Sequence, residues 1–396
     1  MKWPTATIDS IKSGDRYALV GGPFGSNLIT NDYVDEGVPV IRGANLPADQ
    51  PFLDEQFVFV RETKADELLP NNARPGDLIF TQRGTLGQVG LIPLSARYDR
   101  YVISQSQMKL TVDPDKADIR FVYYFFRHPG TVQAIKNRSI TSGVPHINLG
   151  ILKAIELPLP PVAVQSRIAS ILSAYDDLIE NNTRRIALLE QAARLLYEEW
   201  FVRLRFPRLR QGYGGQAGRK HTRIVDGVPK GWMKTRLGDI FELQYGKALK
   251  EDNRVAGPVP VYGSSGIVGT HEVALVKGPG IIVGRKGNVG SIHWSFADFW
   301  PIDTVYYVPP DCVSLYLFHA LRTVSFQSSD VAVPGLNRSY AHSISILAPA
   351  DTLRRQFEEI AGPIYEQMNR LRQMNEKLRG ARDLLLPRLM SGEIAA

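Results

Sequence analysis

Short loops rich in polar and basic side chains, most of them next to glycine, are the best candidates for chemistry in this chain. Glycine allows a backbone to approach a ligand closely. Glutamine, asparagine and arginine carry paired donors or acceptors that fit base edges, whereas serine, threonine and backbone N–H groups suit phosphates. One such loop is more often a plain turn. The hypothesis of a nucleic-acid contact therefore depends on the recurrence of these loops.

The loops recur in both halves of the chain. The candidate contact residues of the first half are Phe24, Gly25, Ser26, Asn27, Arg42, Asn45, Gln82, Arg83, Thr85, Gln105 and Gln107. Those of the second half are Lys247, Tyr262, Ser264, Ser265, Arg285, Lys286, Asn288, Asn337 and Arg338. Parallel sets at matching places favour two copies of one binding surface over a collection of turns.

Motifs of an enzyme are missing from the sequence. It contains no phosphate-binding GxxxxGK[ST] loop, no HExxH pair, no GxSxG elbow and no dinucleotide fingerprint. The seven histidines are scattered and there is one cysteine, so the usual zinc sites cannot form. Asp54 followed by Glu62 and Lys64 is the nearest approach to a nuclease metal site, but it has no counterpart in the second half. We expect no catalytic residue, metal or cofactor on this chain.

Composition indicates a globular protein with an anionic partner. The chain has 396 residues, 44% of them hydrophobic, which is enough for two or three domains with sizeable cores. Because no segment resembles a signal peptide or a membrane span, we expect a cytoplasmic location. The formal net charge is +7. Residues 201–225 hold seven basic and no acidic side chains around a glycine-rich centre, typical of a flexible linker or of a strap close to phosphates.

The second half of the chain repeats the first. Pro145-His146-Ile147-Asn148 returns as Pro334-Gly335-Leu336-Asn337, and Arg83-Gly84-Thr85-Leu86-Gly87 as Lys286-Gly287-Asn288-Val289-Gly290. The period is too long for a solenoid and indicates a duplicated domain. Each copy alternates short β-branched or aromatic runs with turns, which predicts two α/β (α+β) domains. Helices are expected at Ile119–Phe126 and around Leu315–Thr323.

Each half ends in a heptad pattern, which predicts two long helices of about 33 residues and so about 50 Å each. The first seam consists of Ile168, Leu172, Tyr175, Ile179, Asn182, Ile186, Leu189, Ala193, Leu196 and Trp200. The second consists of Phe357, Ala361, Ile364, Met368, Leu371, Asn375, Leu378, Arg382, Leu385 and Leu389. Gly362-Pro363 should kink the second helix or start it afresh, and Pro387 and Gly392 should mark its end.

The order of several motifs resembles the specificity subunit of a Type I restriction-modification system. In the first half these are Pro23-Phe24-Gly25-Ser26, Pro75-Gly76-Asp77-Leu78-Ile79, Gly84-Thr85-Leu86-Gly87 and Leu157-Pro158-Leu159-Pro160-Pro161. In the second they are Pro229-Lys230-Gly231-Trp232 and the terminal Leu384-Leu385-Leu386-Pro387-Arg388-Leu389-Met390-Ser391-Gly392. The second half departs from the pattern, with Tyr245-Gly246-Lys247 in place of Phe-Gly-Ser and Leu347-Ala348-Pro349-Ala350 in place of the proline-rich stretch.

This resemblance implies a non-catalytic reader of double-stranded DNA. Two target recognition domains would each read half of an asymmetric, interrupted site, and the helices would separate them and dock two methyltransferase (modification) subunits, which the restriction/motor subunits then join. The chain itself would bind no cofactor, and the partner subunits would use S-adenosylmethionine, ATP and Mg²⁺. Two alternatives remain open: an enzyme that modifies DNA alone at an unrecognised site, and a coiled-coil adaptor that binds only proteins.

The expected architecture is two similar recognition domains in pseudo-twofold relation, separated by two antiparallel helices. The divisions are residues 1–157 for the first domain, 158–206 for the first spacer helix, 207–230 for the basic linker, 231–349 for the second domain and 350–396 for the second spacer helix. A centred antiparallel register places Asn182 against Asn375 in one central layer. The same register places the Arg382 guanidinium over the ring of Tyr175. An asparagine pair would satisfy itself, penalise slipped registers and so fix the separation of the half-sites.

Overall fold

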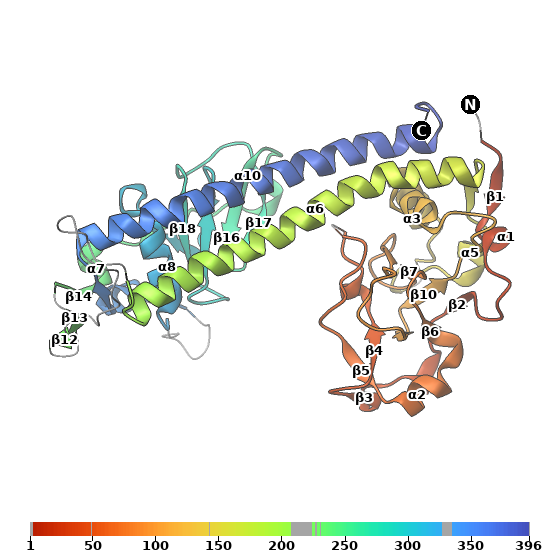
Figure 1. Ribbon diagram of the computed structural model, residues 1–396, viewed down its shortest axis with the longest axis horizontal. Coiled ribbons are helices and arrows are strands. Elements are labelled where there is room, and N and C mark those ends of the chain that lie inside the picture. The colour runs from red at the N-terminus through yellow and green to blue at the C-terminus, as the bar shows by residue number, and fades with distance from the viewer. Residues whose placement is uncertain are drawn as a thin grey trace, which may run out of the picture. The chain divides into compact units, whose positions relative to one another are not determined.

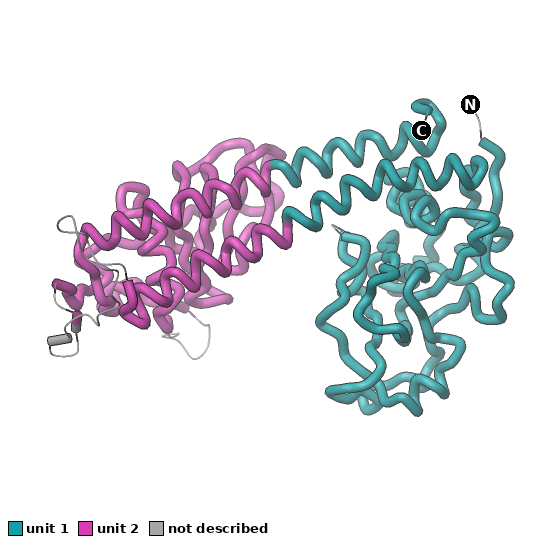
Figure 2. Tube along the Cα trace, in the orientation of Figure 1, with its two compact units in different colours: residues 1–182, 374–396 teal, residues 183–373 magenta. Residues whose placement is uncertain are grey.

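The chain forms two compact units, each described here from a computed structural model (Figures 1 and 2). Unit 1 comprises residues 1–182 and 374–396, and unit 2 comprises residues 183–373. The structure describes residues 3–48, 50–141, 143–206, 224–225, 228–229, 231–326 and 335–395. The predicted basic linker, residues 207–230, therefore lies outside the described residues except for the short pair β12 (Ile224–Val225) and β13 (Val228–Pro229).

Unit 1 is built on two sheets. The first has the order β2 (Leu19–Gly21), β10 (Gln107–Leu110), β7 (Leu78–Thr81) and β8 (Val89–Leu91), and is antiparallel throughout. The second has the order β3 (Tyr33–Val34), β5 (Val58–Val60), β4 (Val38–Ile41), β9 (Tyr101–Ile103) and β6 (Asn72–Ala73), with β4 and β9 parallel. A separate pair joins β1 (Thr5–Thr7) to β11 (Glu156–Pro158).

The helices of unit 1 complete its core. They are α1 (Ile8–Ile11), α2 (Glu62–Glu67), α3 (Ile119–Arg127), α4 (Pro129–Asn137) and α5 (Leu149–Lys153). The Asp118 side chain accepts from the backbone N–H groups of Arg120 and Phe121 and so caps the start of α3. Residues 121–126 of this helix are all buried, and the ring of Phe126 meets that of Phe80 in β7 at 4.6 Å between centroids. Helix α3 thus ties the central sheet to the long helices.

Unit 2 repeats this plan and confirms the duplication. Its four-stranded sheet has the order β15 (Gln244–Tyr245), β21 (Val305–Tyr307), β18 (Gly280–Gly284) and β19 (Ile292–Ser295). The pair β14 (Met233–Arg236) and β22 (Ser345–Ala348) corresponds to β1 and β11. The second sheet is smaller, with β17 (Gly266–His271), β16 (Val259–Gly263) and β20 (Trp300–Pro301). Helices α7 (Leu237–Ile240), α8 (Leu315–Thr323) and α9 (Arg338–Ser343) take the places of α1, α3 and α5.

Two long helices run through both units. Helix α6 (Val162–Tyr197) has 36 residues and ends in a π-helical turn, Glu198–Val202, and α10 (Asp351–Met390) has 40 residues. They run antiparallel within each unit: Ile168 and Leu172 share a core with Leu386 and Leu389 in unit 1, and the 193–201 segment shares one with the 353–368 segment in unit 2. Most of the predicted seam positions are buried.

Of the two alternatives expected at Gly362-Pro363, a kink or a fresh start of the helix, the fresh start is wrong, because α10 is continuous there. Pro363 removes the hydrogen bond that the carbonyl of Glu359 would accept, but both residues are exposed, so water can replace the lost donor. Pro387 lies in the last turn, and Gly392 follows the helix with a φ of +72°, a left-handed conformation suited to glycine at a helix end. Among the described helices none is long and apolar enough to cross a membrane.

The register of the helices in unit 1 is the one that the sequence predicts. The Asn182 amide donates to the Asn375 side-chain oxygen at 2.9 Å, and the Asn375 amide donates to the backbone carbonyl of Ile179 at 3.3 Å. The predicted stacking of Arg382 on Tyr175 is wrong. The guanidinium instead contacts the buried carboxylate of Asp176 and bonds to Asp383, since a desolvated charge gains more from a carboxylate than from a ring face.

We expect Asn182→Leu to lower the free energy of unfolding of unit 1 by about 1–3 kcal/mol, because the buried Asn375 amide would lose its side-chain partner. The double variant Asn182→Leu/Asn375→Leu should recover most of that loss, since no buried amide then faces an apolar side chain. Urea denaturation followed by hydrogen exchange at the centre of α6 measures both effects. Equal destabilisation by the single and double variants would show that the pair does not matter.

Candidate nucleic-acid interface

One loop is built in the same way in both units, directly after an inner strand of the four-stranded sheet, β7 in unit 1 and β18 in unit 2. In unit 1 the backbone N–H groups of Gln82 and Arg83 both donate to the Ser106 carbonyl, at 2.7 and 3.4 Å. In unit 2 those of Arg285 and Lys286 both donate to the Thr304 carbonyl, at 2.9 and 3.0 Å. Gln82 therefore corresponds to Arg285, and Arg83 to Lys286.

A second set of bonds fixes the far side of this loop. The Gln82 carbonyl accepts from the Ile147 backbone N–H at 2.9 Å, and the Arg285 carbonyl accepts from that of Leu336 at 2.8 Å. Gly84 and Gly87 have φ values of +99° and +90°, and the corresponding Gly287 and Gly290 have +78° and +75°. These left-handed positions are accessible to glycine without strain. The loop thereby leaves its intervening side chains, Thr85 in unit 1 and Asn288 in unit 2, exposed.

Three loops of unit 1 meet at this place. The Gln105 side-chain amide donates to the carbonyls of Gly25 and Leu28, at 2.6 and 2.7 Å, and the Gln82 amide donates to the Gln105 carbonyl at 3.4 Å. The loops at 22–28, 82–87 and 104–106 are thereby joined. The predicted contact residues that are exposed on them are Phe24, Gly25, Ser26, Asn27, Arg83, Thr85 and Gln105.

Unit 2 places more positive charge at the corresponding surface. The Arg285 guanidinium lies over the ring of Tyr245 at 5.0 Å and donates to the Asp303 carbonyl at 3.1 Å. Arg338 lies over the same ring at 4.9 Å and pairs with Glu242 at 3.1 Å. Tyr245 is therefore contacted by two guanidinium groups, an arrangement that holds both cations near the surface. Tyr245 is not among the contact residues predicted from the sequence. Its position beside Gly246-Lys247, where the second half departs from the Phe-Gly-Ser pattern, could have indicated it.

The remaining predicted residues of unit 2 lie close to this cluster. The backbone N–H of Asn288 donates to the Ser264 hydroxyl at 3.4 Å, and the Ser264 carbonyl accepts from the Ser291 hydroxyl at 2.5 Å. Lys247, Ser265, Lys286 and Asn288 are exposed. Burial raises the pKa of Tyr306, whose ring lies 5.6 Å from the Arg285 guanidinium, so this phenol is neutral and offers the cation a ring face.

Three predicted contact residues lie inside the fold instead of on its surface. Asn45 is 0% exposed, and its amide donates to the carbonyls of Leu53 and Glu55 at 3.0 Å each. Gln107 is buried at the start of β10 and bonds to the Ser104 hydroxyl, and Tyr262 is buried against Phe299. These buried side chains stabilise the loops from inside the fold. Their polar groups are hydrogen-bonded within the protein and are not exposed for contact with DNA.

Two further predicted residues have structural partners at the surface. The Asn337 side chain accepts from the Tyr340 backbone N–H at 3.1 Å and so caps α9. Arg42 is half-buried, and its guanidinium donates to the Gln56 carbonyl at 3.5 Å. Both side chains hold loop ends in place.

Comparison with known proteins shows the family to which the domains carrying these loops belong. A family model described as the Type I restriction modification DNA specificity domain matches residues 31–191 and again residues 229–351. The chain belongs to this family. The two matches contain the loops that follow β7 and β18, so the recurring loop is part of the family's repeated domain.

Known specificity subunits are similar over most of their length. The MjaIX specificity subunit of Methanocaldococcus jannaschii is 22% identical over 354 residues, which are 81% of this chain and 78% of that protein. The HindI specificity subunit of Haemophilus influenzae is 22% identical over 416 residues, with 82% and 89% covered. The crystal structure of the Type I S subunit from M. genitalium has a TM-score of 0.56 at 19% identity, with 98% and 96% covered, and it shows the same fold.

Specificity subunits of Type I systems are non-catalytic DNA-recognition subunits, and this chain is one of them. Among the described residues no group of three or more His, Cys, Asp or Glu side chains could hold a metal ion. Asp54 accepts from the Tyr101 hydroxyl at 2.8 Å, Glu62 pairs with Arg100, and Lys64 pairs with Glu67. The three residues that came nearest to a nuclease metal site in the sequence thus each contact a different partner.

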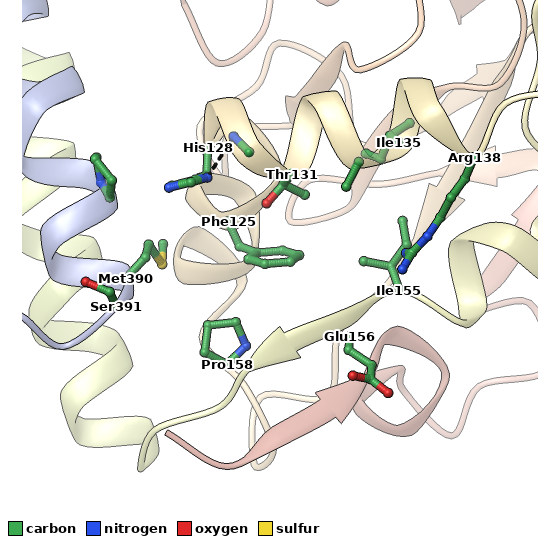
Figure 3. Close-up of a pocket in the computed structure, with 13 residues that line it drawn as sticks. Phe125, His128, Thr131, Ile135, Arg138, Ile155, Glu156, Pro158, Met390 and Ser391 are labelled. Carbon is green, nitrogen blue, oxygen red and sulfur yellow. Dashed lines mark hydrogen bonds between the residues drawn. The ribbon is translucent and has the colours of Figure 1, made fainter. Parts of the chain in front are cut away.

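A cavity of about 460 Å³ in this specificity subunit lies between α3, α4, β11 and the end of α10 (Figure 3). Its lining includes Phe125, Ile135, Ile155 and Met390, and His128 is its one imidazole. The His128 Nδ1 accepts from the Gly130 backbone N–H at 3.0 Å and caps α4, while burial lowers the pKa of this imidazole. The Nδ1 atom of this histidine is therefore used in the fold, as the cap of α4.

Proposed function

We propose that this specificity subunit reads an asymmetric, bipartite site in double-stranded DNA, one half-site with the joined loops of unit 1 and the other with those of unit 2. The observation that carries the proposal is one backbone scaffold with different side chains. Gln82 and Arg83 occupy the places that Arg285 and Lys286 occupy in unit 2. Because glutamine and arginine suit different base edges, two equal scaffolds with unequal side chains favour two different half-sites.

The chemistry of the system resides, in this proposal, on partner proteins in the bacterial or archaeal cytoplasm. Two methyltransferase subunits would dock on the long helices, and restriction/motor subunits would join them, using S-adenosylmethionine, ATP and Mg²⁺ of their own. Both helices support this with large apolar side chains exposed to solvent. These are Leu178, Leu188 and Leu195 on α6, and Ile360, Met374 and Leu384 on α10. Exposed apolar side chains on a helix pair are typical of a surface that a partner covers.

Single substitutions in the two loops test the proposal. We expect Arg83→Ala to change the methylated motif only in the half-site read by unit 1, and Arg285→Ala only in the other. Loss of a bidentate base contact costs about 1–3 kcal/mol at one position. Loss of a phosphate contact weakens binding to all sequences and reduces the salt slope by about one. Sequencing of methylated DNA from cells that express the whole complex, and salt-dependent gel shifts of the subunit with its methyltransferase, measure the two effects.

Matched controls are Arg61→Ala in unit 1 and Arg236→Ala in unit 2, since both arginines are exposed and lie outside the loops. If the loop variants and the controls behaved alike, these loops would be ordinary turns. An adaptor that binds only proteins would not retard DNA at all, and an enzyme that acts alone would methylate or cleave DNA without its partners.

A further inference from the structure

The loop between β2 and β3 carries an aromatic ring that unit 1 leaves uncovered. Phe24 is 89% exposed, although Pro23 before it and Leu28 after it are buried. A single exposed apolar side chain is common on protein surfaces. Phe24 differs from such a residue in the construction of the loop that holds it and in the polar groups that surround it.

The loop is held in one conformation by three features. The Gln105 side-chain amide donates to the carbonyl of Gly25, the first residue of a 3-10 turn at Gly25–Asn27, and to that of Leu28, which directly follows the turn. Gly25 has a φ of +56°, in the left-handed region that favours glycine. A Cβ on Gly22 would lie 2.2 Å from the Ser104 carbonyl oxygen, so the loop starts in direct contact with the neighbouring strand end. The ring is thus presented from a fixed base.

This fixed ring stands beside the side chains with which unit 1 would read DNA. Gln105, which clamps the loop, also accepts from the Gln82 side-chain amide through its backbone carbonyl, and Arg83 follows Gln82 in the chain. Ser26 and Asn27 are exposed on the same turn. An apolar ring among donors, acceptors and a cation suits a DNA site where polar groups contact base edges and phosphates and an apolar side chain can enter between stacked base pairs.

Unit 2 has no such ring at the corresponding place. A Cβ on Gly246 would lie 2.0 Å from the Ile302 carbonyl oxygen, which makes Gly246 the counterpart of Gly22. Two residues further on, Ala248 stands where Phe24 does. The aromatic residue of that loop is Tyr245, at the place of Gly21, and it lies against the guanidinium groups of Arg285 and Arg338.

We propose that Phe24 inserts its ring at one base step of the half-site read by unit 1 and partly unstacks it, while the half-site read by unit 2 stays stacked. The proposal rests on the proposed function. Phenylalanine is among the residues that proteins use as wedges between base pairs, and the unstacking they cause kinks the duplex locally. The difference between Phe24 and Ala248 makes this distortion asymmetric.

Fluorescence of 2-aminopurine, which rises when the base loses its stacking neighbours, tests the proposal. The methylated motif is first determined by sequencing, and 2-aminopurine is then placed at each adenine of both half-sites and next to them in otherwise matched duplexes. On binding of the complete subunit with its methyltransferase, we expect a rise at one step of the first half-site. Because methyltransferases flip their target adenine, that position is excluded from the comparison. Phe24→Ala should abolish the rise, and Phe24→Leu, which keeps an apolar wedge, should retain it.

Affinity for the unlabelled duplex should fall roughly tenfold or more in Phe24→Ala, since burial of a phenylalanine is worth at least about that factor. Leu94→Ala removes another exposed apolar side chain, 87% exposed on a different loop of unit 1, and should change neither signal. A wild-type complex that fails to retard its duplex would defeat the proposed function itself. Specific binding without the Phe24-dependent rise would overturn only the wedge. Weaker capture of the methyltransferase by Phe24→Ala, with DNA binding of the assembled complex unchanged, would assign the ring to a protein contact and overturn it as well.

Discussion

Replacement of Arg382 by alanine should destabilise unit 1 by about 3–5 kcal/mol, the loss typical of a buried ion pair that is broken on one side. Arg382 and Asp176 are 5% and 7% exposed and in direct contact where α10 crosses α6. The Tyr124 hydroxyl of α3 donates to the same carboxylate at 2.6 Å. Without Arg382 the carboxylate keeps this one donor and loses its countercharge. Urea denaturation, with hydrogen exchange of α3 as the reporter of unit 1, measures the loss.

The control is Arg388→Ala on the same helix. Arg388 is exposed and pairs with Glu393 at 2.8 Å, and an exposed pair contributes about 0–1 kcal/mol. The triple variant Arg382→Met/Asp176→Leu/Tyr124→Phe removes the whole polar group and should lie close to wild type, because apolar replacements of a buried pair are often neutral. If Arg382→Ala were no worse than Arg388→Ala, the ion pair would not hold the recognition domain to the helices.

Unit 2 uses different chemistry at the same junction. The sequence repeat aligns Asp176 with Tyr365 and Arg382 with Ala193, and the side chain that bonds to Asp176 or Tyr365 comes from α3 or α8, as Tyr124 or His319. There the Tyr365 hydroxyl and the His319 Nε2 share a hydrogen bond of 3.1 Å. Unit 1 thus has an ion pair at this junction and unit 2 has a neutral pair. If the recognition domain of one unit docked on the helix segments of the other, a buried charge would be left unpaired. Such unpaired charges disfavour incorrect docking.

Periodicity was enough to predict the frame of this protein. A strict alternation of three and four residues fixes which helix faces meet, and the position of the single asparagine in each seam then fixes the register at Asn182 and Asn375. Strong local signals also define the short helices: α8 spans the predicted Leu315–Thr323, and α3 extends the predicted Ile119–Phe126 by one residue. Local propensity and burial point to the same answer in these segments.

Contacts that depend on tertiary neighbours could not be predicted in this way. Asn45 and Gln107 lie in segments with the composition of DNA-reading loops, but the fold buries both side chains. The Asn45 amide donates to the Leu53 carbonyl, and the Gln107 side-chain oxygen accepts from the Ser104 hydroxyl. Arg382 contacts Asp176 and not the predicted Tyr175, which is the preceding residue. The polar partner of a side chain depends on the direction in which that side chain points, which the heptad position alone does not give. Sequence patterns therefore located the loops, while the structure separates exposed side chains from supporting ones.

Acid should destabilise unit 2 through His319. This imidazole is 2% exposed, lies against the Tyr197 ring at 5.5 Å and has the cations Arg322 and Arg194 nearby. Burial, reinforced by these cations, lowers its pKa to about 3 from the ordinary 6.5. Between these two values the unfolded chain binds a proton that the folded chain excludes. As the pH is lowered below 6.5, the free energy of unfolding should therefore decrease by roughly 1.4 kcal/mol per pH unit, in addition to the decrease that carboxylate protonation causes.

His319→Gln isolates this contribution, because glutamine can still bond to the Tyr365 hydroxyl but does not titrate. At pH 7.5 the variant should be nearly as stable as wild type. Between pH 7.5 and pH 4.5 its free energy of unfolding should fall by roughly 2–3 kcal/mol less than that of wild type, because only the wild-type histidine stabilises the unfolded chain by binding a proton over these two pH units below 6.5. The matched control, His146→Gln in a loop of unit 1, should keep the acid loss of unit 2. Denaturation at a series of pH values, with hydrogen exchange of α8 as the reporter, gives the difference. Parallel curves for wild type and His319→Gln would mean that the imidazole is protonated within the fold, where the Tyr365 hydroxyl would then have to accept its proton instead of donating one.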